Sequence, residues 1–195
     1  MTFAGKDEID RVLSALGEHL AAQQAPPLDL LVCGGSALHA LRLVKRTTKD
    51  VDIIALVKDE TVLNTAKTLP SYLLQAAKKV ERDFQLKEDW LNSGPASALD
   101  LGLPAGVLGR AETIAYGTAL TVRFISRYDQ VHFKLYAAVD QGGKHYDDLL
   151  ALKPKPEELE EAARWSMTHD VSEGYRGEIK RIITEMGHPD VAQRL

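Results

Sequence analysis

The chain has 195 residues, of which 45% are hydrophobic and 27% charged, and its formal net charge is −4. This composition is that of a globular protein and excludes a disordered chain, while the length fits one domain or one domain with a small extension. A negative net charge excludes a protein whose whole surface binds nucleic acid, so any RNA contact would need a local basic patch. The single cysteine, Cys33, excludes an internal disulfide and a cysteine-based zinc site.

The sequence also indicates where the protein works. Its N-terminal residues lack the basic-then-apolar layout of a signal peptide. No apolar run approaches the length of a membrane span, so we expect a cytoplasmic protein without a membrane partner. Cys33 lies in an apolar run, where a small buried side chain is expected and not a nucleophile.

The first third of the chain predicts helix, strand, helix and strand in turn. Apolar spacing over residues 7–24 predicts an amphipathic helix that Pro26 and Pro27 end. Leu28–Cys33 predicts a buried strand, and the periodic residues 37–44 predict a short helix. The apolar run 53–57 continues a second strand.

The remainder predicts helices with one further strand. Residues 60–80 have helical spacing, split at Pro70, and the Gly and Pro residues of 84–110 predict a long loop in which Trp90 is a local anchor. Alternation over 120–125 predicts a strand. The other expected elements are helices at 129–140, 146–152 and 156–167, then a capping box at 170–173 that opens a helix to Met186, and a short tail after Pro189. We therefore expect an α/β (α+β) domain at 1–152 and a helical extension at 153–195.

The turn after the first strand is a candidate phosphate site. It reads Gly34-Gly35-Ser36 and leads into the predicted short helix. Glycines let a ligand approach the backbone closely, and the start of a helix offers N–H groups to a phosphate. Alone, such a turn is a weak signal, because many strands end in one.

Asp50 and Asp52 are candidate metal ligands. Alternate side chains of a strand share a face, so both point the same way and Val51 turns into the core. Two close carboxylates repel unless a cation lies between them, and Mg²⁺ is commonly bound by one or two carboxylates plus phosphates. A solvated strand end explains this pair equally well when it is taken alone. The glycine turn and the two aspartates together, within one βαβ-sized unit, favour a metal–phosphate site.

These motifs resemble the nucleotidyltransferase (polymerase-β-like) superfamily, through Gly35-Ser36 and the sequence Asp-Val-Asp-Ile at 50–53. The motif Arg-Thr-Thr-Lys-Asp-Val-Asp at residues 46–52 resembles more narrowly the AbiEii-type toxins of type IV toxin–antitoxin systems and their relatives. The resemblance implies a nucleotidyltransferase fold, with a small mixed sheet flanked by helices. It also implies Mg²⁺ (or Mn²⁺) held by Asp50 and Asp52. The nucleotide-binding residues that it implies are Gly34, Gly35, Ser36, Thr48 and Lys134. Relatives tend to carry a Trp-Leu-Asn-like element where this chain has residues 90–92, so this segment is expected to border the site.

The later part of the chain offers Lys134 and Asp148. A lysine near a buried helix face needs a partner of opposite charge. Considered without the resemblance, Lys134 is expected to form a salt bridge with Asp148 or another acid. The family carries an Asp followed five residues later by a Lys, as Asp129 and Lys134 are here. By this resemblance Lys134 binds the nucleotide phosphates, and Asp148, or else Asp147, is a catalytic acid or base. The family usually has an Arg where this chain offers Asp140, Gln141 or Lys144, and a lysine does not reproduce an arginine fork.

The expected activity is Mg²⁺-dependent transfer of a nucleoside monophosphate from an NTP such as ATP to a hydroxyl. By resemblance the acceptor is RNA (tRNA), the protein is a toxin, and an antitoxin is a partner. One alternative is an inactive transferase fold used for binding or regulation. The other is a transferase that modifies small molecules such as antibiotics.

Overall fold

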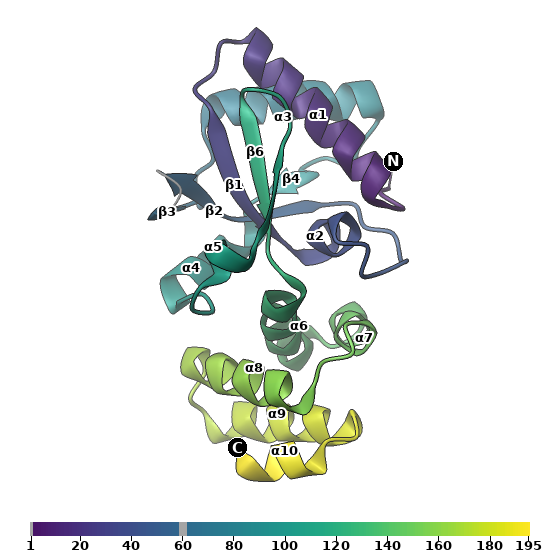
Figure 1. The fold of residues 1–195 in the computed structure, drawn as a ribbon, viewed down its shortest axis with the longest axis vertical. Helices are drawn as coiled ribbons and strands as arrows, with labels where there is room; N and C mark the ends of the chain where they lie inside the picture. Colours follow the sequence, from purple (N-terminus) through teal and green to yellow (C-terminus); the bar gives the residue numbers. More distant parts are fainter. Residues whose placement is uncertain (1, 59–61) are drawn as a thin grey trace. The chain divides into compact units, whose positions relative to one another are not determined.

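The computed structural model describes residues 2–58 and 62–195, which form two compact units, Met1–Ser126 and Arg127–Leu195 (Figure 1). The predicted domains divide at residue 152, whereas these units divide after Ser126. Among the described residues, no helix is long and apolar enough to cross a membrane.

The first unit is built on a mixed six-stranded sheet. Its strand order is β3-β2-β1-β6-β5, and β4 pairs with β2. β1 is antiparallel to β2 and parallel to β6, whereas β4 runs parallel to the start of β2. The strands are β1 (Leu28–Cys33), β2 (Val51–Lys58), β3 (Val62–Thr65), β4 (Leu91–Asn92), β5 (Glu112–Ala115) and β6 (Leu120–Phe124). This mixed sheet with helices confirms the predicted α+β class.

Helices α1 (Lys6–Ala22) and α3 (Ser71–Phe84) lie side by side and place their apolar faces in the core of this unit (Figure 1). Leu16 of α1 and Leu73 of α3 are both fully buried. The other helical segments are α2 (Gly34–Ala40), the 3-10 helix η1 (Gly94–Ala96), α4 (Ser97–Leu101) and α5 (Val107–Arg110). α2 follows β1 without a break, which fixes the turn of the candidate site.

Local sequence predicted most of these elements, and three expectations need correction. Residues 62–65 form an edge strand and not a helix, because Leu63 pairs with Val57 across the sheet; residues 60 and 61 lie outside the described part. The segment 84–110 is not one loop, because it holds β4, η1, α4 and α5. Strand β5, mostly exposed, was not predicted.

The second unit is helical. It contains α6 (Arg127–Gln141), α7 (Lys144–Ala151), α8 (Pro156–His169), α9 (Glu173–Glu185) and α10 (Pro189–Arg194). α6 packs against α7, α8 and α9, and Trp165 of α8 contacts the rings of Phe133 and Tyr136 on α6. Ser172 caps α9 by accepting a bond from the Tyr175 amide, so the cap lies two residues after the predicted Asp170. The expected tail is helix α10.

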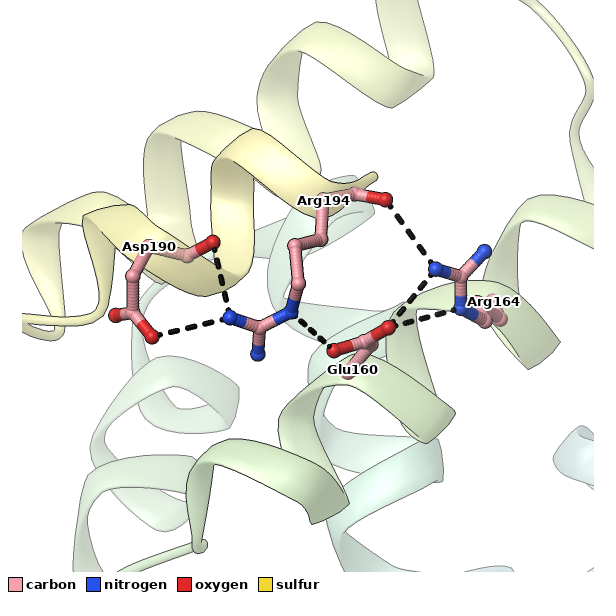
Figure 2. A network of polar contacts seen from close by, with 4 residues as sticks. All are labelled: Glu160, Arg164, Asp190 and Arg194. Carbon is pink, nitrogen blue, oxygen red and sulfur yellow. Dashed lines mark hydrogen bonds and ion pairs between the residues drawn. The ribbon is translucent and has the colours of Figure 1, made fainter.

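A polar network joins α8 to α10 (Figure 2). The Glu160 carboxylate accepts hydrogen bonds from Arg164 at 2.8 Å and from Arg194 at 2.7 Å, and Arg194 also contacts Asp190 at 3.2 Å. The bonds from Arg164 and Arg194 lower the pKa of Glu160. The network links α10 to α8 at the surface, while Val191 and Ala192 of α10 are buried.

We expect Glu160→Gln to lower the melting temperature slightly at pH 6, and the difference from wild type to vanish in acid. The pKa of Glu160 is lower in the folded than in the unfolded chain. Its contribution is therefore present above the unfolded value of about 4.3 and is lost as pH falls through the lower folded value. Thermal unfolding followed by circular dichroism between pH 6 and acid measures this. An equal difference at every pH would contradict it.

Candidate metal and nucleotide site

The turn between β1 and α2 brings the backbone of Gly34 against the Asp52 carboxylate. Gly34 has a φ of +72°, in the left-handed region that glycine adopts at little cost. A Cβ at this position would overlap Oδ2 of Asp52. The absence of a side chain at Gly34 therefore leaves room for the carboxylate, and two of the predicted site residues lie in contact.

Asp52 is held in place by both of its neighbouring strands. In the sheet it is the register partner of Cys33 on β1 and of Asn92 on β4. The Asn92 amide donates from Nδ2 to Asp52 Oδ1 at 3.1 Å, and its own Oδ1 accepts from the Gly94 amide at 2.9 Å. Asn92 was not among the predicted site residues. The Trp-Leu-Asn segment was its signal, and that segment does lie beside Asp52.

Asp50 lies immediately before β2. The Val51 side chain that separates the two aspartates is 1% exposed, as the alternation predicts. Asp50 is partly exposed, and its Oδ1 is 3.2 Å from Nζ of Lys87. This ion pair is open to solvent on the lysine side, so its contribution to stability is small.

Trp90 anchors β4 next to these aspartates. Its ring is 1% exposed, packs edge-on against Phe3 and donates from Nε1 to the Ala77 carbonyl at 3.1 Å. Its own carbonyl accepts from the Val51 amide at 2.6 Å. Trp90 is thus the local anchor that the sequence predicts, and it fixes the position of Asn92 two residues later.

Gly35 lies against the segment that leads into β2. A Cβ on Gly35 would lie 2.5 Å from Thr48 Oγ1 and 3.4 Å from Arg46 Nη2. Thr48 is buried, and two backbone hydrogen bonds of 2.7 and 3.0 Å pair it with Phe3. The predicted residues Gly35 and Thr48 are therefore in contact. Arg46 also lies beside Gly35, and it was not among the predicted site residues.

Ser36 is fully buried in the first turn of α2. Its hydroxyl donates to the Cys33 carbonyl at 3.3 Å, which closes the turn from β1 into the helix. The predicted phosphate contact of Ser36 stays a prediction, because it requires the hydroxyl to exchange this bond. Cys33 is 3% exposed, in agreement with the small buried side chain predicted for it.

Asp50 and Asp52 carry the kind of oxygen ligand that a hard divalent cation prefers. Mg²⁺ prefers oxygen ligands, keeps several waters and is usually bound by one or two carboxylates plus substrate phosphates. Asp50 and Asp52 supply two partly exposed carboxylates at one end of β2. Within residues 2–58 and 62–195, no group of three or more His, Cys, Asp or Glu side chains is placed so that it could hold a metal ion.

Lys134 and Asp148 come together in the second unit. Lys134 Nζ lies 2.8 Å from Asp148 Oδ2, with only 5% and 2% of the two side chains exposed. The salt bridge expected for Lys134 without the resemblance is therefore present. Asp147 is exposed, so Asp148 is the buried member of that pair of acids. The predicted roles of both residues in catalysis stay predictions.

Comparison with known proteins gives no match to a family model, a curated protein or a solved structure. In the first unit Gly34 contacts Asp52, Gly35 contacts Thr48, and Asn92 binds Asp52. Lys134 contacts Asp148 in the second unit.

We expect Gly34→Ala to displace Asp52 and to abolish Mg²⁺-dependent nucleotide binding. A left-handed alanine costs about 1–2 kcal/mol in any position, and here its Cβ also overlaps the carboxylate. Gly117→Ala is the control, because Gly117 has a φ of +79° and no atom within 4 Å of its would-be Cβ. Urea unfolding and calorimetric nucleotide titration measure both effects. Equal destabilisation, with nucleotide binding intact in Gly34→Ala, would refute the close contact.

Proposed function

We propose that the protein is a Mg²⁺-dependent nucleotidyltransferase that moves a nucleoside monophosphate from an NTP to a hydroxyl acceptor. The observation that carries the proposal is the contact of the Gly34 turn with the Asp52 carboxylate. A phosphate seated on that turn would lie beside a carboxylate, and this arrangement is unfavourable unless a cation lies between them. The mixed sheet and the order of its motifs support assignment to the nucleotidyltransferase fold.

The proposed reaction is an in-line displacement at the α-phosphorus. The acceptor hydroxyl oxygen forms a bond to this phosphorus, the bond between the phosphorus and the α–β bridging oxygen breaks, and pyrophosphate leaves with the electron pair. The hydroxyl proton passes to a base or to water. Bound Mg²⁺ would neutralise phosphate charge and orient the reacting oxygens. Such catalysis depends on positioning and electrostatics more than on a strong nucleophile.

In this proposal, different residues of the first unit bind the metal and the phosphates. Asp50 and Asp52 hold the metal, and Asn92 orients Asp52 through its hydrogen bond. The amides of Gly34 and Gly35 hold the outer phosphates, and Arg46 beside Gly35 adds a positive charge. As a toxin in the cytoplasm, the protein would use RNA (tRNA) as acceptor and an antitoxin as partner. The resemblance assigns Lys134 to the phosphates and Asp148 to the acceptor proton, and in the second unit these two side chains bind each other.

The activity is tested by incubating the protein with Mg²⁺, each NTP labelled on its α-phosphate, and total RNA. We expect label in RNA and release of unlabelled pyrophosphate. Label that enters aminoglycosides and never RNA would identify the small-molecule transferase. Absence of transfer from every NTP to any acceptor would refute the activity and favour an inactive fold that serves binding.

A further inference from the structure

A strongly basic segment borders the candidate site. Residues 42–49 connect α2 to β2 and contain Arg42, Lys45, Arg46 and Lys49 without a single acidic residue. The whole chain has a net charge of −4, so this segment is opposite in sign to the average surface. It is the local basic patch that an RNA contact requires in an acidic protein.

The cationic side chains of the segment are accessible. Arg42, Lys45 and Lys49 are exposed, whereas Arg46 is half-buried beside Gly35. Throughout residues 2–58 and 62–195, no acidic side chain forms an ion pair with any of the three exposed cations. These three side chains are therefore available for contact with a negatively charged ligand.

Backbone hydrogen bonds hold the segment at both ends. Arg42 N donates to the His39 carbonyl at 2.9 Å, and Leu43 N donates to the Leu38 carbonyl at 2.8 Å. At the other end, Thr48 pairs with Phe3. The backbone that carries these cations is thus held between the turn at Gly35 and the aspartates.

A second basic cluster in the first unit, residues 78–82, differs from this segment because acidic residues lie within and beside it. Lys78, Lys79 and Arg82 lie on the outer face of α3, and Lys78 contacts Glu81 at 3.2 Å and Glu88 at 3.6 Å. Acidic residues at 81 and 83 interrupt this cluster in sequence. The acidic residues within this cluster lower its local net charge, which makes it a suitable control for a surface defined by charge.

We propose that the basic segment 42–49 binds the phosphate backbone of a single-stranded RNA acceptor and leads its terminal hydroxyl to the site. This inference rests on the proposed nucleotidyl transfer and assigns the surface that selects the acceptor. A polyanion gains from contact with these exposed cations, and protein groups that neutralise RNA phosphates release counterions. A polycationic acceptor such as an aminoglycoside would be repelled by the same charges.

The experiment measures binding of a fluorescein-labelled single-stranded RNA by anisotropy at several salt concentrations. We expect the triple variant Arg42→Gln, Lys45→Gln and Lys49→Gln to bind at least ~10-fold more weakly at low salt. Its slope of log K against log salt should fall by about 2, since each contact to single-stranded RNA contributes roughly 0.7. The control triple variant, Lys78→Gln, Lys79→Gln and Arg82→Gln, has the same change in charge and should bind as the wild type does.

Calorimetric binding of an NTP with Mg²⁺ separates this proposal from the proposed function. Both triple variants should bind the nucleotide as the wild type does, because they leave Arg46 and the aspartates intact. RNA affinity that is unchanged in the 42–49 variant, or lowered equally in both variants, would overturn the proposed surface. Wild-type protein that binds Mg²⁺–NTP but no RNA would also overturn it and leave nucleotidyl transfer standing. RNA binding through this segment without any NTP binding would support the surface and refute the transferase.

Discussion

Asp52→Asn should reduce nucleotidyl transfer by roughly 10²–10³-fold or more, the loss typical when one charge-stabilising group is removed from an active site. Asparagine has nearly the same shape as aspartate, so its side-chain oxygen still accepts the bond from Asn92. The substitution removes the negative charge that attracts a divalent cation. We therefore expect the folded structure to survive and the activity to disappear, as measured by transfer of labelled NMP beside circular dichroism.

The matched control is Asp100→Asn. Asp100 is an exposed acid on α4 that pairs with Lys67 and is not one of the proposed metal ligands. It should retain full activity. A fully active Asp52→Asn variant would contradict the assignment of this carboxylate as a metal ligand.

Lys134→Met should lower the free energy of unfolding of the second unit by about 3–5 kcal/mol, because it leaves the Asp148 carboxylate buried without its cation. Only 2% of the Asp148 side chain is exposed, and the ion pair is short at 2.8 Å. Hydrogen exchange of peptides from α6 and α7 measures the stability of this unit directly. Lys144→Met, which removes an exposed lysine from α7, is the control and should have little effect.

The double variant Lys134→Met, Asp148→Leu sharpens this test. Replacing both members of a buried ion pair by apolar residues is often neutral or stabilising, so much of the loss should be recovered. A Lys134→Met variant as stable as the wild type would contradict a structural role for the pair. Loss of activity in such a stable variant would favour the predicted phosphate contact.

The sequence predicted those elements whose limits are set by neighbouring residues. β1 was predicted correctly because a run that is apolar apart from Asp29 lies between Pro27 and Gly34. The start of α3 at Ser71 follows from Pro70, whose fixed φ suits the residue before a helix. The burial of Val51 between two aspartates follows from strand alternation.

The features that were missed depend on contacts between distant parts of the chain. β3 has helical spacing in sequence but pairs with β2, and short apolar segments do not distinguish the two structures. Asn92 reaches Asp52, forty residues away, through the parallel pairing of β4 with β2. The spacing of Asp129 and Lys134 could not distinguish a phosphate ligand from the buried ion pair that Lys134 forms with Asp148.

Calorimetric titration of an NTP into the wild-type protein, with and without Mg²⁺, tests the metal–nucleotide site most directly. The double variant Asp50→Asn, Asp52→Asn is titrated alongside, and circular dichroism confirms that it is folded. We predict binding by the wild type that requires Mg²⁺ and no measurable binding by the double variant. Binding of equal affinity without Mg²⁺, or to the double variant, would contradict a site in which these carboxylates and a metal hold the nucleotide.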